Sequence, residues 1–434
     1  MNESFKELHG QVNTPEYLVG QIFNLLPNHL LRDSTLKWLD PGCGTGVFSK
    51  YILDRLAISL NSDNETIIKN NLYMVEYNNY HNDKLLDLFG ENINLSNSDY
   101  LLYQPDIKFD IIIGNPPYNQ NHLRHIPNKL NPKKTDKKWI PIWHMFIEKS
   151  IELLNDYGYL TFIIPATWLK PDKANIYELL TKYKIHKLHS LSSYEVYKAF
   201  NKSAQIPCTY FLLQKIPTDN IIPIYDDITN TYINYNLYKP NLPIPMKNIS
   251  ILNKLIYYTE KYGSLYDHVL ITPTPSRKIT LSDSESEQFC YKNIYTCNLL
   301  NSEPVLKYKW SDKPGPFYCV GLPKLVLAHS VFGFPFLDIS GICGICSRDK
   351  FVFLGNLNFL NALNNFLSLK CSYFLYSSTR YRMRFLERYI FELIPDISKL
   401  PDFDLTKISD QYIYEYFDFN KNEIDLITKT KLWK

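Results

Sequence analysis

Glycine is scarce in this 434-residue chain: it occurs 15 times, at about half of the ~7% that is usual for proteins. Long hydrophobic runs are also missing, since no stretch of ~18 apolar residues appears, and this excludes a membrane span. The first residues, MNESFKELHG, lack the basic and apolar regions of a secretory signal. The net charge is only +3, so any polyanionic partner must be bound by local basic patches.

The eight cysteines are scattered through the chain, which indicates reduced thiols in the cytoplasm rather than a disulfide framework. Cys343 and Cys346 form a single CxxC without a second pair or a pair of histidines at zinc spacing. We therefore interpret these two residues as small buried side chains and expect no metal site.

Short apolar runs alternate with helical patterns in the first half of the chain, which is typical of a doubly wound, Rossmann-like α/β domain. A helix is expected over residues 142–154, where apolar residues recur at helical spacing. The expected strands are residues 36–40, 72–76, 109–113, 159–164, 187–191 and 209–213.

The second half of the chain differs in character. We expect a catalytic domain over residues 1–215, a proline-punctuated linker over 216–245 and a second, α+β domain over 246–434. Strand-like runs at 322–338 and 350–354 and a long helical pattern at 359–393 support the α+β assignment.

Three of the few glycines, Gly42, Gly44 and Gly46, follow an apolar run and Asp40. Such a turn lets the backbone approach a ligand closely at the start of a helix. The turn is followed by Val47 rather than by the Lys and Ser or Thr of a phosphate loop, and its spacing is not GxGxxG.

Acidic residues follow the next strands. Glu76 ends the second expected strand, where an acid in this kind of fold accepts hydrogen bonds from the ribose hydroxyls of a cofactor. Asp99 comes 23 residues later, before another strand.

The apolar run at 109–113 stops at Gly114 and the sequence Asn115-Pro116-Pro117-Tyr118. The two prolines fix the backbone and remove two N–H donors, so a rigid turn is expected at the carboxyl end of a strand. Such a turn can hold hydrogen-bond acceptors in place without rearrangement.

These motifs resemble those of class I S-adenosylmethionine-dependent methyltransferases, in which Asp40 to Gly46 match motif I and the NPPY turn matches motif IV. The resemblance implies that S-adenosylmethionine is the cofactor and that Glu76 and Asp99 bind its ribose and its adenine amino group. It also implies that Asn115 takes part in binding the cofactor, and that its side-chain oxygen and the Pro116 carbonyl accept hydrogen bonds from a planar target amine. Pro117 completes this turn.

The NPPY turn alone does not select the substrate, because glutamine methyltransferases and guanine-N2 RNA methyltransferases carry it too. Thr14 and Pro15 precede the glycine turn as a helix start. This arrangement, together with the sequence around residues 139–169, is similar to the type II DNA adenine-N6 methyltransferases with a C-terminal target-recognition domain. The resemblance covers residues 11–215 and implies that Thr14 and Pro15 contact the methionine end of the cofactor.

In that family two aromatic rings sandwich a flipped adenine. Tyr118 is expected to stack on one face of the base. Phe200 is our choice for the other face, with Tyr197 as the alternative.

DNA is expected to bind at two basic segments. Residues 120–140 carry a net charge of +5 beside the catalytic turn, which suits phosphate contacts; the lysines that we assign to DNA are Lys133, Lys134, Lys137 and Lys138. Arg380 and Arg384, with Arg388, recur at helical spacing further on and are assigned the same role.

The expected function is therefore methylation of adenine N6 in duplex DNA without a metal ion, with a separately encoded restriction endonuclease as a possible partner. Two alternatives stay open: an RNA adenine methyltransferase with the same pocket, and a methyltransferase-like DNA-binding subunit of a larger complex.

Overall fold

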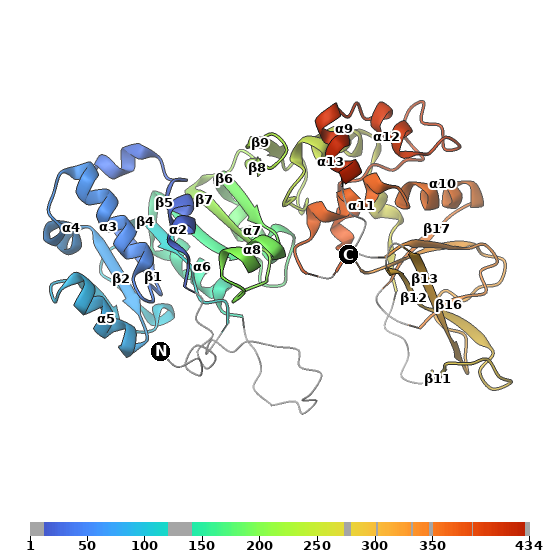
Figure 1. Cartoon of the computed structure of the whole chain (residues 1–434), viewed down its shortest axis with the longest axis horizontal. Helices are drawn as coiled ribbons and strands as arrows, with labels where there is room; N and C mark the ends of the chain where they lie inside the picture. Colours follow the sequence, from blue (N-terminus) through green and yellow to red (C-terminus); the bar gives the residue numbers. More distant parts are fainter. Residues whose placement is uncertain are drawn as a thin grey trace. The chain divides into compact units, whose positions relative to one another are not determined.

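The computed structural model describes residues 13–119, 141–272, 279–300, 303–330, 333–346, 350–383 and 385–429. The chain folds into two compact units (Figure 1). The first unit extends to Tyr225 and includes Asn234–Leu237, and the second comprises Asp226–Ile233 and the residues from Tyr238 onward. The division lies inside the segment 216–245 that was expected to be a linker.

A nine-stranded sheet with the order β3-β2-β1-β4-β5-β7-β6-β8-β9 forms the first unit. Strands β3, β2, β1, β4 and β5 are parallel neighbours, and β7 runs antiparallel between β5 and β6. This confirms the doubly wound α/β fold. The strands are β1 Trp38–Pro41, β2 Leu72–Glu76, β3 Asn94–Asn97, β4 Phe109–Gly114, β5 Leu154–Pro165, β6 Tyr183–Leu191, β7 Cys208–Pro217, β8 Ile221–Asp226 and β9 Thr231–Asn236.

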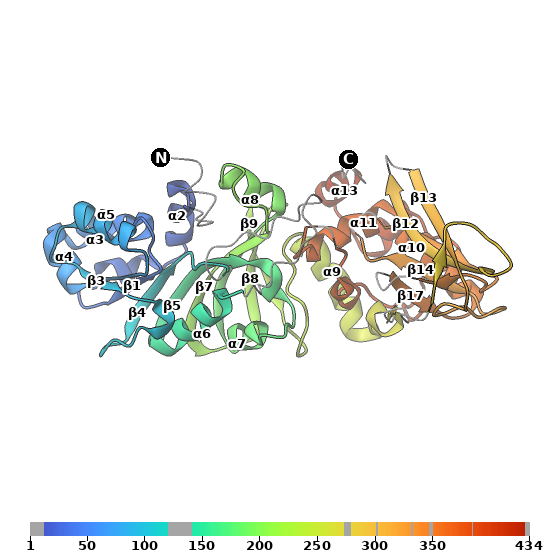
Figure 2. The same cartoon turned by 90° about the horizontal axis from the view of Figure 1, so that it is seen from below.

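Helices cover both faces of this sheet: Figure 2 shows α2 on one side and α6 and α7 on the other. Helix α6 buries Phe146, Ile147 and Ile151, the apolar residues at helical spacing that predicted it. The described helices include none that is long and apolar enough to cross a membrane. The helices of the unit are α2 Glu16–Phe23, α3 Val47–Leu60, α4 Asn64–Asn70, α5 Asn79–Phe89, α6 Trp143–Leu153, α7 Ile176–Thr181 and α8 Ser193–Ala199.

The six predicted strands all exist, and β2 has its predicted bounds. Strand β3 was not predicted, because its sequence, NLSN, is polar and its side chains are at most half-buried at the edge of the sheet. Strands β8 and β9 lie within the segment that was expected to be an irregular linker.

The second unit combines two four-stranded sheets with separate helices, which confirms its α+β class. The sheet orders are β10-β17-β14-β15 and β11-β13-β12-β16. Ile294, Cys297, Val326 and Val352 belong to a buried core that draws on both sheets. The strands are β10 Leu270–Ile271, β11 Leu281–Ser282, β12 Tyr291–Leu300, β13 Glu303–Ser311, β14 Lys324–Ala328, β15 Pro335–Asp338, β16 Gly344–Ile345 and β17 Lys350–Leu354. The helices are α9 Ile249–Tyr262, α10 Leu357–Leu367, α11 Lys370–Tyr376, α12 Asp410–Tyr416 and α13 Lys421–Lys429.

The long helix predicted over 359–393 is wrong. Helices α10 and α11 are followed only by short 3-10 turns, because the backbone at Arg380 leaves the helical region with ψ of 60°. The Tyr381 hydroxyl then donates to the Ile244 carbonyl oxygen at 2.8 Å, which anchors this irregular segment.

Candidate active site

The predicted site residues lie along the carboxyl edge of the sheet. The register pairs Pro41 of β1 with Val75 of β2, and Gly114 of β4 with Phe162 of β5. Because parallel strands end at the same edge, the glycine turn, Glu76 and Asn115 all emerge there. Ligands of open α/β sheets bind at this edge.

The glycine turn has a backbone that requires glycine. Gly44 has φ of 58° and Gly46 has φ of 79°, both left-handed. A Cβ on Gly46 would lie 2.7 Å from the Leu85 side chain, so Gly46 allows α5 to pack against the turn. A Cβ on Gly44 would meet no atom within 4 Å, so this part of the turn faces open space. Gly42 completes the turn, and its N–H donates to the Val75 carbonyl oxygen at 2.8 Å.

Glu76 is joined directly to this turn. Its Oε2 accepts a hydrogen bond from the Gly44 N–H at 2.7 Å, and its Oε1 accepts one from the Asn78 N–H at 2.8 Å. The buried His81 ring lies on the same side, with Nδ1 3.7 Å from Oε1. Burial raises the pKa of Glu76. The hydrogen bonds from His81, Asn78 and Gly44 together lower it by more, so the pKa of Glu76 lies below its ordinary value. Glu76 is therefore a carboxylate at neutral pH.

Asp40 is enclosed beneath the turn. Its Oδ2 accepts from the Ser49 N–H at 3.1 Å and from the Ser49 hydroxyl at 2.7 Å, which fixes the start of α3. Burial raises the pKa of Asp40 to about 7; the Ser49 hydrogen bonds oppose this shift and the Glu76 charge adds to it. Asp40 thus supports the turn from inside, and its assignment to the cofactor stays a prediction.

Thr14 and Asn115 are 101 positions apart in the sequence and meet at the edge. The Asn115 Nδ2 donates to the Thr14 Oγ1 at 3.1 Å. The Asn115 Oδ1 is buried and has no hydrogen-bond partner among the described residues. Helix α2 begins at Glu16, with Pro15 at its N-cap and without a side-chain cap. The prediction that Thr14 caps this helix is therefore wrong, and its hydroxyl contacts Asn115 instead.

The Tyr118 ring is held at its hydroxyl end. The Tyr118 hydroxyl lies 3.4 Å from the Ile163 carbonyl oxygen and 3.4 Å from the Cys208 Sγ. Burial, and then Cys208, raise the pKa of Tyr118 well above its ordinary value, so the phenol is neutral. Pro116 is buried and Pro117 is half-buried in the same turn.

The other predicted residues of this site have varied surroundings. Asp99 is half-buried, and its Oδ1 accepts from the Leu101 N–H at 2.9 Å. Phe200 is 5% exposed at the end of α8, so protein already covers its ring. Tyr197 is half-buried on the same helix. The choice between these two rings for the second face of the base stays a prediction.

Of the residues assigned to DNA, Lys133, Lys134, Lys137, Lys138 and Arg384 lie outside the described residues. The predicted helical stripe of arginines is wrong, because the described residues between Arg380 and Arg388 are not helical. Instead, the Arg380 Nη2 donates to the Met383 carbonyl oxygen at 2.7 Å. The Arg388 Nη2 donates to the Val269 carbonyl oxygen at 2.8 Å. These guanidinium groups brace irregular backbone; a DNA contact of Arg380 stays a prediction.

Sequence reasoning missed three residues that support the site, namely Ser49, His81 and Cys208. Ser49 could have been found, since it lies three positions after Gly46 in the first turn of a helix. His81 and Cys208 carry no local signal, because their contacts with Glu76 and Tyr118 arise only from the fold.

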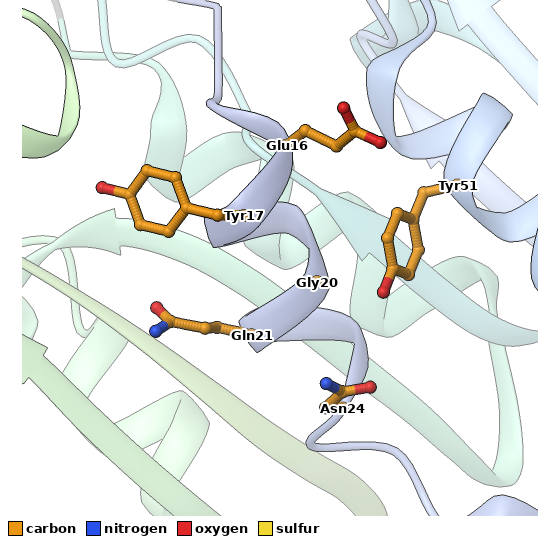
Figure 3. A pocket seen from close by; sticks show the side chains of 6 residues that line it. All are labelled: Glu16, Tyr17, Gly20, Gln21, Asn24 and Tyr51. Atoms are coloured by element: carbon orange, nitrogen blue, oxygen red, sulfur yellow. The ribbon is translucent and has the colours of Figure 1, made fainter.

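A groove beside α2 is separate from these residues (Figure 3). Tyr51 of α3 faces α2 across Gly20, where a Cβ would lie only 3.1 Å from the Tyr51 hydroxyl. None of the predicted site residues lines this groove, whose lining is Glu16, Tyr17, Gly20, Gln21, Asn24 and Tyr51.

Three features of the edge fit the cofactor that the sequence resemblance implies. Gly44 borders open space, as a close approach of ligand to backbone requires. The Glu76 Oε2 accepts the Gly44 N–H with one lone pair and keeps another for a ribose hydroxyl. No described residue donates to the Asn115 Oδ1, and burial of such an acceptor is costly unless a ligand satisfies it.

Comparisons with known proteins agree with this geometry. The family described as Eco57I restriction-modification methylase matches residues 48–197. The type II methyltransferase M.TthHB8I of Thermus thermophilus is 39% identical over 85 residues, which are 17% of this chain and 20% of that protein. The type II methyltransferase M.BstVI of Geobacillus stearothermophilus is 28% identical over 267 residues, which are 52% of this chain and 46% of that protein. Both matches span less than half of the relative's own length.

Among solved structures, the type IIL restriction-modification enzyme MmeI in complex with DNA is 12% identical, with a TM-score of 0.49 over 89% of this chain and 68% of that chain. The family match includes Glu76, Asp99 and the NPPY turn. Residues 48–197 of this chain are therefore similar to the Eco57I restriction-modification methylase family.

Proposed function

We propose that the chain methylates N6 of an adenine that has been flipped out of duplex DNA, with S-adenosylmethionine as the methyl donor. The observation that carries this proposal is the Asn115 side chain. Its Nδ2 is occupied by Thr14, whereas its buried Oδ1 has no partner in the part of the chain that the structure describes. The amide is thus held with its acceptor oxygen free for an N–H group of a ligand.

An exocyclic amine supplies the matching donors. With Asn115 Oδ1 accepting one N–H and the Pro116 carbonyl oxygen accepting the other, the nitrogen lone pair is drawn out of conjugation with the ring. Both acceptors belong to a turn with two consecutive prolines, so they need no reorganisation during the reaction. The neutral Tyr118 ring supplies a stacking surface for the base.

The cofactor-binding part of the proposal assigns Glu76 to the ribose hydroxyls, Asp99 to the adenine amino group, and Thr14, Pro15 and Asp40–Gly46 to the methionine end and its surroundings. When bound, S-adenosylmethionine supplies a methyl group already activated by the sulfonium. The protein then contributes positioning and electrostatics.

DNA is the proposed partner, and residues 246–434 are the proposed target-recognition domain. Support comes from the methylase domain and from the type II methyltransferases that match the chain. A separately encoded restriction endonuclease is a further proposed partner, and resistance of the methylated DNA to that nuclease would test it.

The direct test is incubation of the protein with unmethylated duplex DNA, matched single-stranded RNA and methyl-labelled S-adenosylmethionine. We expect label in duplex DNA, recovered as N6-methyladenine, and sequencing of that DNA identifies the target site. Label only in RNA would favour the RNA methyltransferase. Cofactor binding without transfer to any substrate would favour a non-catalytic subunit.

Two asparagine variants sharpen this test. Asn115→Ala should lose transfer by about 100-fold or more while retaining cofactor binding in calorimetry. Asn64→Ala, on the exposed start of α4, is the matched control and should leave both unchanged. Full activity of Asn115→Ala would contradict the role assigned to Asn115.

A further inference from the structure

Residues 201–206 connect α8 to β7 and run past the catalytic turn. Cys208 Sγ donates to the Ile206 carbonyl oxygen at 3.1 Å, and the same sulfur lies 3.4 Å from the Tyr118 hydroxyl. The register pairs Cys208 with Pro165 of β5 and with Leu191 of β6. Ile206 therefore lies at the carboxyl edge of the sheet, two residues before Cys208, whose Sγ contacts the Tyr118 hydroxyl.

The Ile206 side chain is apolar and 42% exposed. Its neighbour Pro207 is buried and accepts a hydrogen bond from the Ala166 N–H at 2.8 Å. A residue before proline is confined to extended backbone. The Ile206 side chain thus sits on an anchored backbone and leaves part of its apolar surface exposed.

The segment is rigid and locally strained. Ser193 Oγ donates to the Gln205 carbonyl oxygen at 2.7 Å, and the Lys202 N–H donates to that of Tyr197 at 2.7 Å. Asn201 and Lys202 are consecutive left-handed residues, with φ of 46° and 66°. Left-handed backbone is ordinary for asparagine, whereas it costs about 1 kcal/mol or more for a residue such as lysine.

The surroundings of Ile206 suit a duplex. Lys202 is exposed on the same segment, and Lys198 lies 4.6 Å over the exposed Tyr194 ring on α8. The nearby acid, Glu195, is engaged by the Ser192 N–H at 2.6 Å as part of a helix cap. Exposed lysines on the same connection and on the helix before it add positive charge that fits contacts with phosphates.

We propose that Ile206 is an apolar wedge that enters the base stack of duplex DNA beside the target adenine; this inference rests on the proposed function. A flipped base leaves a gap in the stack, and unstacking costs free energy that an inserted side chain offsets. Ile206 has the required chemistry, exposure and rigidity, and it lies at the edge where the flipped base is to be received.

The test measures single-turnover methylation of two duplexes that contain the site methylated by the wild-type chain. In one duplex the target adenine is paired; in the other it faces an abasic position, so that little pairing opposes flipping. Ile206→Ala should slow methylation of the paired duplex by about 10-fold, and of the abasic duplex by no more than about 2-fold. Ile206→Leu should retain the wild-type rate on both.

Ile58→Ala, on a residue of α3 that is 78% exposed, is the matched control and should methylate both duplexes at the wild-type rate. A fluorescent 2-aminopurine in place of the target adenine reports flipping directly, and its signal should fall in Ile206→Ala. An unchanged rate on the paired duplex, or an equal loss on both duplexes, would overturn the wedge while leaving the methyltransferase intact. No DNA methylation by the wild-type chain would instead overturn the proposed function, and the wedge with it.

Discussion

The Asn115 side-chain amide donates to the Thr14 hydroxyl at 3.1 Å, which joins the catalytic turn to the segment that precedes α2. In this contact Nδ2 is engaged, and Oδ1 remains as the acceptor. The Thr14 hydroxyl thus anchors the side chain in the orientation on which the proposed chemistry depends, because an inverted amide would offer a donor to the target amine.

Removal of the Thr14 hydroxyl tests this relationship. Thr14→Val keeps the shape of the side chain but leaves Asn115 Nδ2 without its acceptor, so we expect methyl transfer at saturating cofactor to fall by about 10-fold. Thr14→Ser keeps the hydroxyl and should restore most of the rate. Single-turnover kinetics check both, and equal rates for the two variants would show that Asn115 does not depend on the hydroxyl.

The Glu76 carboxylate should dominate cofactor affinity. Glu76→Gln removes the charge that accepts from the Gly44 N–H and, as proposed, from the ribose. We expect the cofactor Kd measured by calorimetry to rise by about 10-fold or more. Glu65→Gln, an exposed residue of α4, is the control. A Kd for Glu76→Gln equal to that of the control would remove Glu76 from the proposed cofactor site.

The buried Asp40 should make stability depend on pH. Its pKa of about 7 in the folded protein exceeds the ordinary value of 3.8, so the folded state holds the proton more tightly than the unfolded state. This contribution to the free energy of unfolding is fully present below about pH 4 and is lost as the pH rises to about 7. Urea unfolding across that range should show the decline in wild type relative to Asp40→Asn.

Asp40→Asn keeps an oxygen for Ser49 and does not titrate. The control for this series is Asp54→Asn, which alters an exposed acid paired with Lys50 and leaves Asp40 in place, so this variant should keep the decline between about pH 4 and about pH 7. A constant difference between wild type and Asp40→Asn would show that Asp40 keeps its ordinary pKa.

The second unit has its own buried ion pair. Lys324 Nζ lies 2.6 Å from Asp338 Oδ2, and both side chains are almost fully buried. Lys324→Met leaves Asp338 without its counter-charge, and we expect the free energy of unfolding of this unit to fall by about 3–5 kcal/mol. Lys407→Met, which breaks an exposed pair with Asp404, should cost less than about 1 kcal/mol.

Cofactor binding, assigned to the first unit, should survive Lys324→Met at urea concentrations where the second unit begins to unfold. Urea titration measures the unfolding of the second unit, and calorimetry at the same urea concentrations measures cofactor binding. Equal destabilisation by Lys324→Met and Lys407→Met would show that the buried pair adds nothing beyond an exposed one.

Much of the catalytic unit was predictable because its signals are local. An apolar run that stops at an acid or at NPPY marks the end of a buried parallel strand, and β2 and β4 accordingly follow their predicted positions. The meeting of Thr14 with Asn115 agrees with the shared site expected from motif order.

The remainder depends on contacts that no local pattern encodes. Strand β3 is polar because it lies at an edge, and Cys208 becomes important only when β7 inserts next to β5 and brings the thiol to Tyr118. The arginines near 380 repeat at helical spacing, yet they donate to backbone carbonyls of an irregular segment. Residues at helical spacing predict a helix correctly only where the backbone keeps helical φ and ψ, and at Arg380 it does not.

The position of β8 determines where a catalytic fragment of this protein can end. Strand β8 pairs with β6 at Leu188 and Ile224 and so covers that side of β6. A fragment that ends at Lys215 would uncover a row of backbone N–H and C=O groups, which favours aggregation between chains. A fragment that ends at Leu237 keeps β8 and β9, and is therefore the better starting point for studying cofactor binding in isolation.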